Sequence, residues 1–138
     1  MGFGKAILAA LEGFMVFNGR SSRAEFWWFF LFTLIASLVA SILEIFIDTK
    51  MISIGVNVAL FMPLLTVTIR RLHDTGRSVK YLMILLAPVP MWFVSSSAGA
   101  LTQLFVIALL GLILCLPGQI GGNRFGPDPQ NAPDLDAF

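Results

Sequence analysis

Four long apolar runs, separated by short polar segments, dominate this chain. They cover residues 26–47, 51–69, 81–95 and 100–116. An α-helix of about 20 apolar residues crosses the roughly 30 Å hydrocarbon core of a bilayer, so we expect each run to be a transmembrane helix. The pattern predicts an all-α fold, an integral membrane bundle of four transmembrane helices.

The composition supports a lipid environment. The chain is 57% hydrophobic and 12% charged, whereas a soluble domain is about 45–50% apolar and about 25% charged. So few charges cannot cover a water-exposed surface. The net charge of +1 gives no reason to expect a nucleic-acid partner. We expect a single membrane domain over residues 1–138.

Residues 1–17 have apolar side chains at helical spacing, with Lys5 and Glu12 outside the apolar stripe. This segment is too short and too charged to span a bilayer, so we expect an amphipathic helix that lies at the membrane interface. A signal peptide is the rival interpretation, but no small-residue cleavage site follows the apolar part.

The third run, residues 81–95, is short for a transmembrane helix and contains Pro88 and Pro90. We expect it to be bent, or to thin the bilayer around it. If it entered and left the membrane on one side, the tail at residues 117–138 would lie on the opposite side from the one predicted below.

Basic residues gather on one predicted face of the membrane. Only Lys50 lies on the other face, against Lys5, Arg20, Arg23, Arg70, Arg71, Arg77, Lys80 and Arg124. Cytoplasmic segments of membrane proteins carry an excess of Lys and Arg. We therefore expect a multi-pass protein whose two termini, with the tail at residues 117–138, are cytoplasmic.

Three polar segments fall on this face, at residues 20–25, 70–77 and 123–128. Charges near lipid are costly unless they are paired, so we expect the segments to touch, with Glu25 and Asp74 each beside an arginine. The predicted cytoplasmic polar cluster consists of Arg20, Ser22, Arg23, Glu25, Arg70, Arg71, His73, Asp74, Arg77, Arg124 and Asp128. It either shapes a helix–turn–helix corner or binds anionic lipid headgroups or a protein partner.

Catalysis is not expected from this cluster. His73 next to Asp74 has the composition of a general base, but no motif places a serine or cysteine nucleophile nearby. One histidine, one cysteine (Cys115) and scattered carboxylates do not make a metal-ligand set. We expect no enzyme activity, no cofactor and no metal site.

Three polar residues, Glu44, Asn57 and Gln103, lie inside the apolar runs. A carboxylate at membrane depth is a functional candidate by default. If Glu44 faced a water-filled path in an oligomer, the chain would be a small proton- or ion-coupled transporter. If it faced the headgroups, or paired with Asn57 or Gln103 in a dry bundle, an accessory role would be favoured.

Three motifs resemble a known family. They are GRxSRxEFW at residues 19–27, RRLHDxGRS at residues 70–78 and NRFGPDP at residues 123–129. Together they resemble a small bacterial inner-membrane family of unknown function, the YhaH/YhaI-like proteins. Val79 and Lys80 depart from the family pattern, where a small residue and an aromatic are expected, and the acidic tail runs past the family's end. The resemblance implies a bacterial inner (cytoplasmic) membrane protein of about four helices and no assigned reaction.

Two functional hypotheses follow. The first is an accessory, scaffold or lipid-interacting membrane protein that meets anionic headgroups on its cytoplasmic face. Its partner would be lipid, another membrane protein or a second copy of the chain in a homo-oligomer. The alternative is the transporter that uses Glu44.

Overall fold

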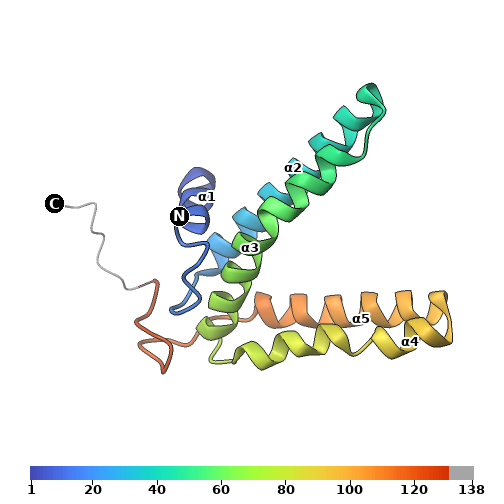
Figure 1. Cartoon of the computed structure of the whole chain (residues 1–138). Helices are drawn as coiled ribbons and strands as arrows, with labels where there is room; N and C mark the ends of the chain where they lie inside the picture. Colours follow the sequence, from blue (N-terminus) through green and yellow to red (C-terminus); the bar gives the residue numbers. More distant parts are fainter. Residues whose placement is uncertain (131–138) are drawn as a thin grey trace.

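The structure, a computed structural model, describes residues 1–130 and is built from helices. Their order is α1 (Phe3–Glu12), α2 (Arg23–Ile47), α3 (Met51–Asp74), the 3-10 helix η1 (Val79–Leu86), α4 (Val89–Val94) and α5 (Ser96–Cys115). Two helical hairpins, α2–α3 and η1/α4–α5, diverge from a common corner, and α1 lies beside the base of the first (Figure 1).

The first hairpin joins the two longest helices. The side-chain oxygen of Ser22 caps α2 by accepting a hydrogen bond from the Glu25 amide over 3.1 Å. The helix ends at Asp48, which adopts the left-handed conformation with φ 54° that allows the chain to turn into α3. Pro63 is accommodated as a buried residue within α3.

The second hairpin contains the third apolar run, which is short and interrupted at its prolines, as the sequence predicted. The run expected to span at residues 81–95 is divided into η1 and α4, with Pro88 between them. At about 2.0 Å per residue for η1 and about 1.5 Å for residues 87–94, this arm of the hairpin reaches about 28 Å. The 3-10 winding lengthens the arm and brings it close to the roughly 30 Å of hydrocarbon.

Three helices are long and apolar enough to cross a membrane, namely α2, α3 and α5, and the segment Val79–Val94 is shorter. The prediction of four full spans therefore holds for three. The predicted membrane bundle is confirmed as an all-α fold, but within the described residues its helices form two hairpins that separate as they leave the corner (Figure 1). Side chains beyond the corner are largely exposed, and lipid is the apolar solvent that suits them.

The buried apolar core lies at the corner, where α1, α2, α3 and α5 meet. It contains Ala10, Phe26, Phe29, Val67, Leu72, Leu110 and Leu114. Helix α1 is shorter than the predicted 1–17 and buries only Ala6 and Ala10. The Phe3 ring packs edge-on against Trp28 with ring centroids 5.7 Å apart. The apolar core thus holds both hairpins where the polar segments converge.

Candidate functional site

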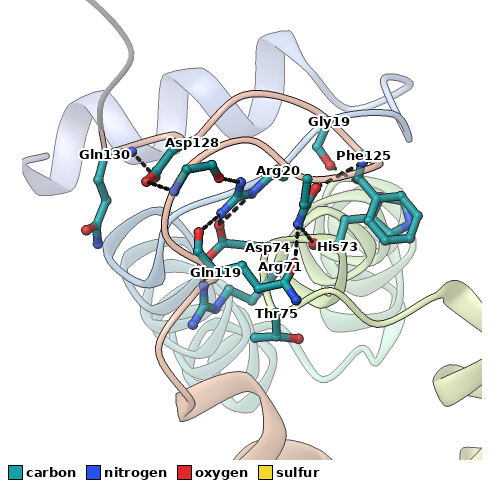
Figure 2. A network of polar contacts seen from close by, with 12 residues as sticks. Gly19, Arg20, Arg71, His73, Asp74, Thr75, Gln119, Phe125, Asp128 and Gln130 are labelled. Carbon is teal, nitrogen blue, oxygen red and sulfur yellow. Dashed lines mark hydrogen bonds and ion pairs between the residues drawn. The ribbon is translucent and has the colours of Figure 1, made fainter.

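A polar network sits on top of this core, formed by residues 19–25, residues 70–77 and the tail at residues 117–128. We call it the arginine corner. Figure 2 shows how the tail folds back across the end of α3 and the loop before α2. The predicted contact between the three segments is present, and buried side-chain polar atoms of the described residues all have a partner.

Asp74, at the end of α3, is the centre of the arginine corner. Its Oδ1 accepts a hydrogen bond from Arg20 Nε over 2.9 Å, and its Oδ2 pairs with Arg71 Nη1. Arg71 is fully buried and Asp74 is 4% exposed. Removing charges from water is costly unless they are paired and hydrogen-bonded, and this carboxylate meets that condition for both guanidinium groups.

Arg20 also binds the tail. Its Nη1 donates to the carbonyl oxygen of Gly121, and its Nη2 donates to that of Gln119. The amide of Gln119 in turn donates to the backbone oxygen of Asp74 over 2.8 Å. The loop before α2, the end of α3 and the tail therefore form one hydrogen-bonded unit.

Arg71 joins the two hairpins. Its Nε donates to the Leu114 carbonyl over 3.0 Å, and its Nη2 donates to the Leu116 carbonyl. These are the carbonyls that the end of α5 leaves without helical partners. A cation at this position also favours the negative end of the helix dipole. Arg71 is thus the main polar link between α3 and α5.

A second ion pair joins α2 and α3. Arg70 pairs with Glu25 and also donates from Nε to the Ser21 hydroxyl over 2.8 Å. The Ser21 amide donates to the Arg70 carbonyl over 3.1 Å. Glu25 and Asp74 therefore both lie beside arginines, as the sequence predicted.

His73 has a packing role. Its ring stacks on Phe125 with centroids 4.0 Å apart, and its Nδ1 lies 3.2 Å from the Gly19 carbonyl oxygen. Asn123 Nδ2 donates to the His73 backbone oxygen over 2.9 Å. The stack and these bonds fix the tail against α3.

The tail loop is closed by its own contacts. Asp128 accepts hydrogen bonds from the Gln130 amide over 2.9 Å and the Gly121 amide over 3.0 Å (Figure 2). These two bonds hold the pKa of Asp128 below its ordinary value. At Gly118, an added Cβ would overlap the Asp74 carboxylate. The close approach of the tail to Asp74 therefore requires glycine at this position.

The predicted residues fall into two groups. Arg20, Ser22, Glu25, Arg70, Arg71, His73 and Asp74 belong to the arginine corner, and Asp128 lies in the loop that covers it. Arg23, Arg77 and Arg124 lie at the edge of the arginine corner, where Arg23 and Arg124 are exposed and Arg77 is half-buried. Arg124 Nη2 donates to the Gly76 carbonyl over 3.4 Å. Arg77 lies 5.8 Å from the Tyr81 ring centre and Arg124 lies 4.6 Å from that of Phe125.

Sequence reasoning missed several members of the network. Some hydrogen-bond acceptors of the arginines look like ordinary loop and helix-end residues in the sequence. They are Ser21, Gln119 and the carbonyls of Leu114 and Leu116. Phe125, which stacks on His73, was also missed. Its place next to Arg124 in the tail motif was the one sequence signal that could have predicted a contact for it.

The intramembrane polar residues do not form one cluster. Glu44 Oε1 accepts a hydrogen bond from the Ser53 amide over 2.7 Å, at the start of α3. Asn57 accepts a hydrogen bond from Ser37 over 2.9 Å. Gln103 lies in α5, on the other hairpin. The cavity beside Glu44 is lined by the hairpin turn itself, Ser41, Ile45, Asp48, Thr49 and Lys50.

Comparison with known proteins identifies relatives over most of the chain. Inner membrane protein YhaI of Escherichia coli (strain K12) is 30% identical over 125 residues, which cover 89% of this chain and 93% of YhaI. Inner membrane protein YhaH of the same strain is 29% identical over 132 residues, 91% of this chain and 97% of YhaH. No solved structure matches the chain.

These names and the apolar helices make this a multi-pass inner-membrane protein. The model of a family described as "Protein of unknown function (DUF805)" matches residues 14–127, which include all three motifs apart from the last two residues of the tail motif. The chain belongs to this family of membrane proteins.

Proposed function

We propose that this protein is an accessory membrane protein, without catalytic activity of its own, whose basic end faces the cytoplasm and binds anionic lipid headgroups. The supporting observation is the separation of its cations. Eight of the nine Lys and Arg residues belong to segments at the arginine-corner end, and Lys50 lies at the far tip of the first hairpin. By the excess of basic residues on cytoplasmic segments, both termini are cytoplasmic.

The cations at this end have two different tasks. Arg20, Arg70 and Arg71 are neutralised by carboxylates inside the arginine corner. The others remain at the surface, namely Lys5, Arg23, Arg77, Lys80 and Arg124. Surface cations beside a bilayer attract anionic headgroups by about 1 kcal/mol each. The inner group builds the corner and the outer group is the candidate contact with lipid.

The contacts of Glu44 and His73 favour an accessory role over transport or catalysis. The Glu44 carboxylate satisfies an amide in the first turn of α3, where helices lack internal partners. His73 is stacked on Phe125, and Asp74 is engaged by two arginines. Each of these titratable groups is occupied by a contact that maintains the fold.

Native mass spectrometry of the protein released from bacterial membranes tests the proposal. We expect phosphatidylglycerol or cardiolipin to be retained in preference to phosphatidylethanolamine, together with a protein partner. Removing three surface cations, with Arg77→Gln, Lys80→Gln and Arg124→Gln, weakens this preference by about fivefold per charge removed. The matched control, Lys50→Gln at the far tip, leaves it unchanged.

Two results would count against the proposal. Equal retention of anionic and zwitterionic lipids by the parent protein contradicts headgroup recognition. Repeated recovery of a monomer that carries lipid and no other protein contradicts the accessory role while leaving the lipid contact in place.

A further inference from the structure

An apolar groove of about 350 Å³ lies between the two hairpins, next to the arginine corner. Its walls include Trp27 and Phe30 of α2, Leu64 of α3, Leu85 of η1 and Leu110 of α5. The hydroxyl of Thr68, which also lines it, already donates to the Leu64 carbonyl over 2.7 Å. Apart from the indole N–H of Trp27, the lining thus presents hydrocarbon, which selects a hydrocarbon occupant.

The shape of the groove narrows the choice. It follows α3 from Thr68 to Phe61 and α5 from Leu114 to Ile107, a rise of about 10 Å along each helix. A volume of about 350 Å³ over this length leaves a cross-section of about 35 Å², less than half that of a helix, which is about 10–12 Å across with its side chains. The groove therefore suits a single acyl chain and not a helix.

A cation lies one helical turn before the start of the groove wall on α2, outside the residues that line the groove. Arg23 begins α2 one helical turn before Trp27, so the two residues share a helix face. Arg23 is exposed and, within residues 1–130, its side chain makes no hydrogen bond or ion pair, in contrast to those of Arg20, Arg70 and Arg71. Its charge is repelled by that of Arg71. An anion beside Arg23 would relieve this repulsion.

We propose that the groove holds one acyl chain of an anionic phospholipid whose phosphate pairs with Arg23. A bilayer supplies both parts of this ligand at the required depths, since hydrocarbon begins directly below the headgroup phosphates. This site rests on the proposed lipid-interacting function. It adds one defined binding position for a headgroup, whereas the other surface cations attract headgroups without fixing their position.

Tryptophan quenching by lipids with brominated acyl chains tests the site. The chain has three tryptophans, and Trp28→Phe with Trp92→Phe leaves Trp27 as the single reporter in the groove. The protein is reconstituted in phosphatidylcholine with a small fraction of brominated phosphatidylglycerol or brominated phosphatidylcholine. We expect Trp27 to be quenched with an apparent affinity about tenfold higher for brominated phosphatidylglycerol, as one charge-assisted hydrogen bond would give.

Two variants separate the phosphate contact from the acyl contact. Arg23→Gln is expected to abolish the preference for phosphatidylglycerol. Its matched control is Lys50→Gln, which removes an exposed cation at the far hairpin tip that does not line the groove and which should keep the preference. Gly111→Leu fills the groove, because a Cβ there meets no atom within 4 Å. It should reduce quenching by both lipids while helix content stays unchanged.

Equal quenching of Trp27 by the two brominated lipids in the parent would overturn this site. If phosphatidylglycerol were still retained preferentially in native mass spectrometry, the proposed function would survive that result. Protection of Trp27 from both lipids in a protein that cross-links as a dimer would also overturn it, since a second copy would then occupy the groove.

Discussion

The Nε atom of Arg20 lies 2.9 Å from Oδ1 of Asp74, and both side chains are almost completely buried. The two residues are 54 positions apart in the chain. Their contact joins the loop before α2 to the last residue of α3, and the other donors of Arg20 extend it to the tail. The arginine corner is therefore a single structural unit built from all three sequence motifs.

Replacing the central carboxylate should be strongly destabilising. Asp74→Asn keeps the shape of the side chain but leaves Arg20 and Arg71 without a counter-charge in a buried site. Losing one partner of a buried ion pair costs about 3–5 kcal/mol, so we expect a loss of about 3 kcal/mol in the free energy of unfolding in detergent. The control is Asp48→Asn at the exposed hairpin tip, which tolerates asparagine in its left-handed conformation. Similar unfolding free energies for the two variants would contradict a central role for Asp74.

The tail should not tolerate a side chain at Gly118. A Cβ there would overlap the Asp74 carboxylate, so Gly118→Ala should displace the tail and expose the sites where it can be cut by protease. Gly122→Ala is the matched control, because its Cβ would meet its nearest neighbour at 3.8 Å. Limited proteolysis of both variants in nanodiscs measures the effect. Equal cleavage rates would show that the tail does not rest on Asp74.

Arg71 should control the relation between the hairpins. Its guanidinium binds two carbonyls at the end of α5 as well as Asp74. A lysine ammonium cannot reproduce this planar fork, so Arg71→Lys should broaden the distribution of distances between α3 and α5. Spin labels at the exposed positions Val58 and Leu112, in a Cys115→Ala background, report this distance by pulsed electron paramagnetic resonance. An unchanged distribution would contradict the linking role.

Glu44 should behave as a helix cap. Glu44→Gln keeps an oxygen that can accept the Ser53 amide, so we expect a loss of stability of no more than about 1 kcal/mol. We also expect no change in proton flux across vesicles that contain the protein, measured with a pH-sensitive dye. A flux in the parent that Glu44→Gln removes would support the transporter alternative instead.

Much of the fold could be predicted from the sequence because the bilayer imposes a simple rule on apolar length. The rule identified α2, α3 and α5, and the capping pattern at Ser22 placed the start of α2 correctly. It also marked residues 81–95 as short and bent, but it could not predict the 3-10 winding of η1, since Pro88 and Pro90 interrupt helical hydrogen bonding. The divergence of the hairpins was likewise hidden, because apolar faces that contact lipid and those that contact protein have the same composition.

The arginine corner was predicted at the level of segments but not of partners. Unpaired charges beside lipid are costly, which was enough to bring the three motifs together. Charge alone could not decide that Asp74 would take Arg20 and Arg71 while Glu25 takes Arg70. Charge also could not predict that Arg71 would bind the carbonyls at the end of α5, since every residue carries a backbone carbonyl.

The most direct test of the account is to label single cysteines from each side of the membrane, in a Cys115→Ala background. Lys80→Cys and Arg124→Cys report the arginine-corner end, and Lys50→Cys and Ser97→Cys report the two hairpin tips. With a membrane-impermeant maleimide, we predict that the first two are labelled only in inverted vesicles and the last two only in spheroplasts. Labelling of Lys80→Cys and Arg124→Cys from opposite sides would contradict the claim that the three motifs meet on one face of the membrane.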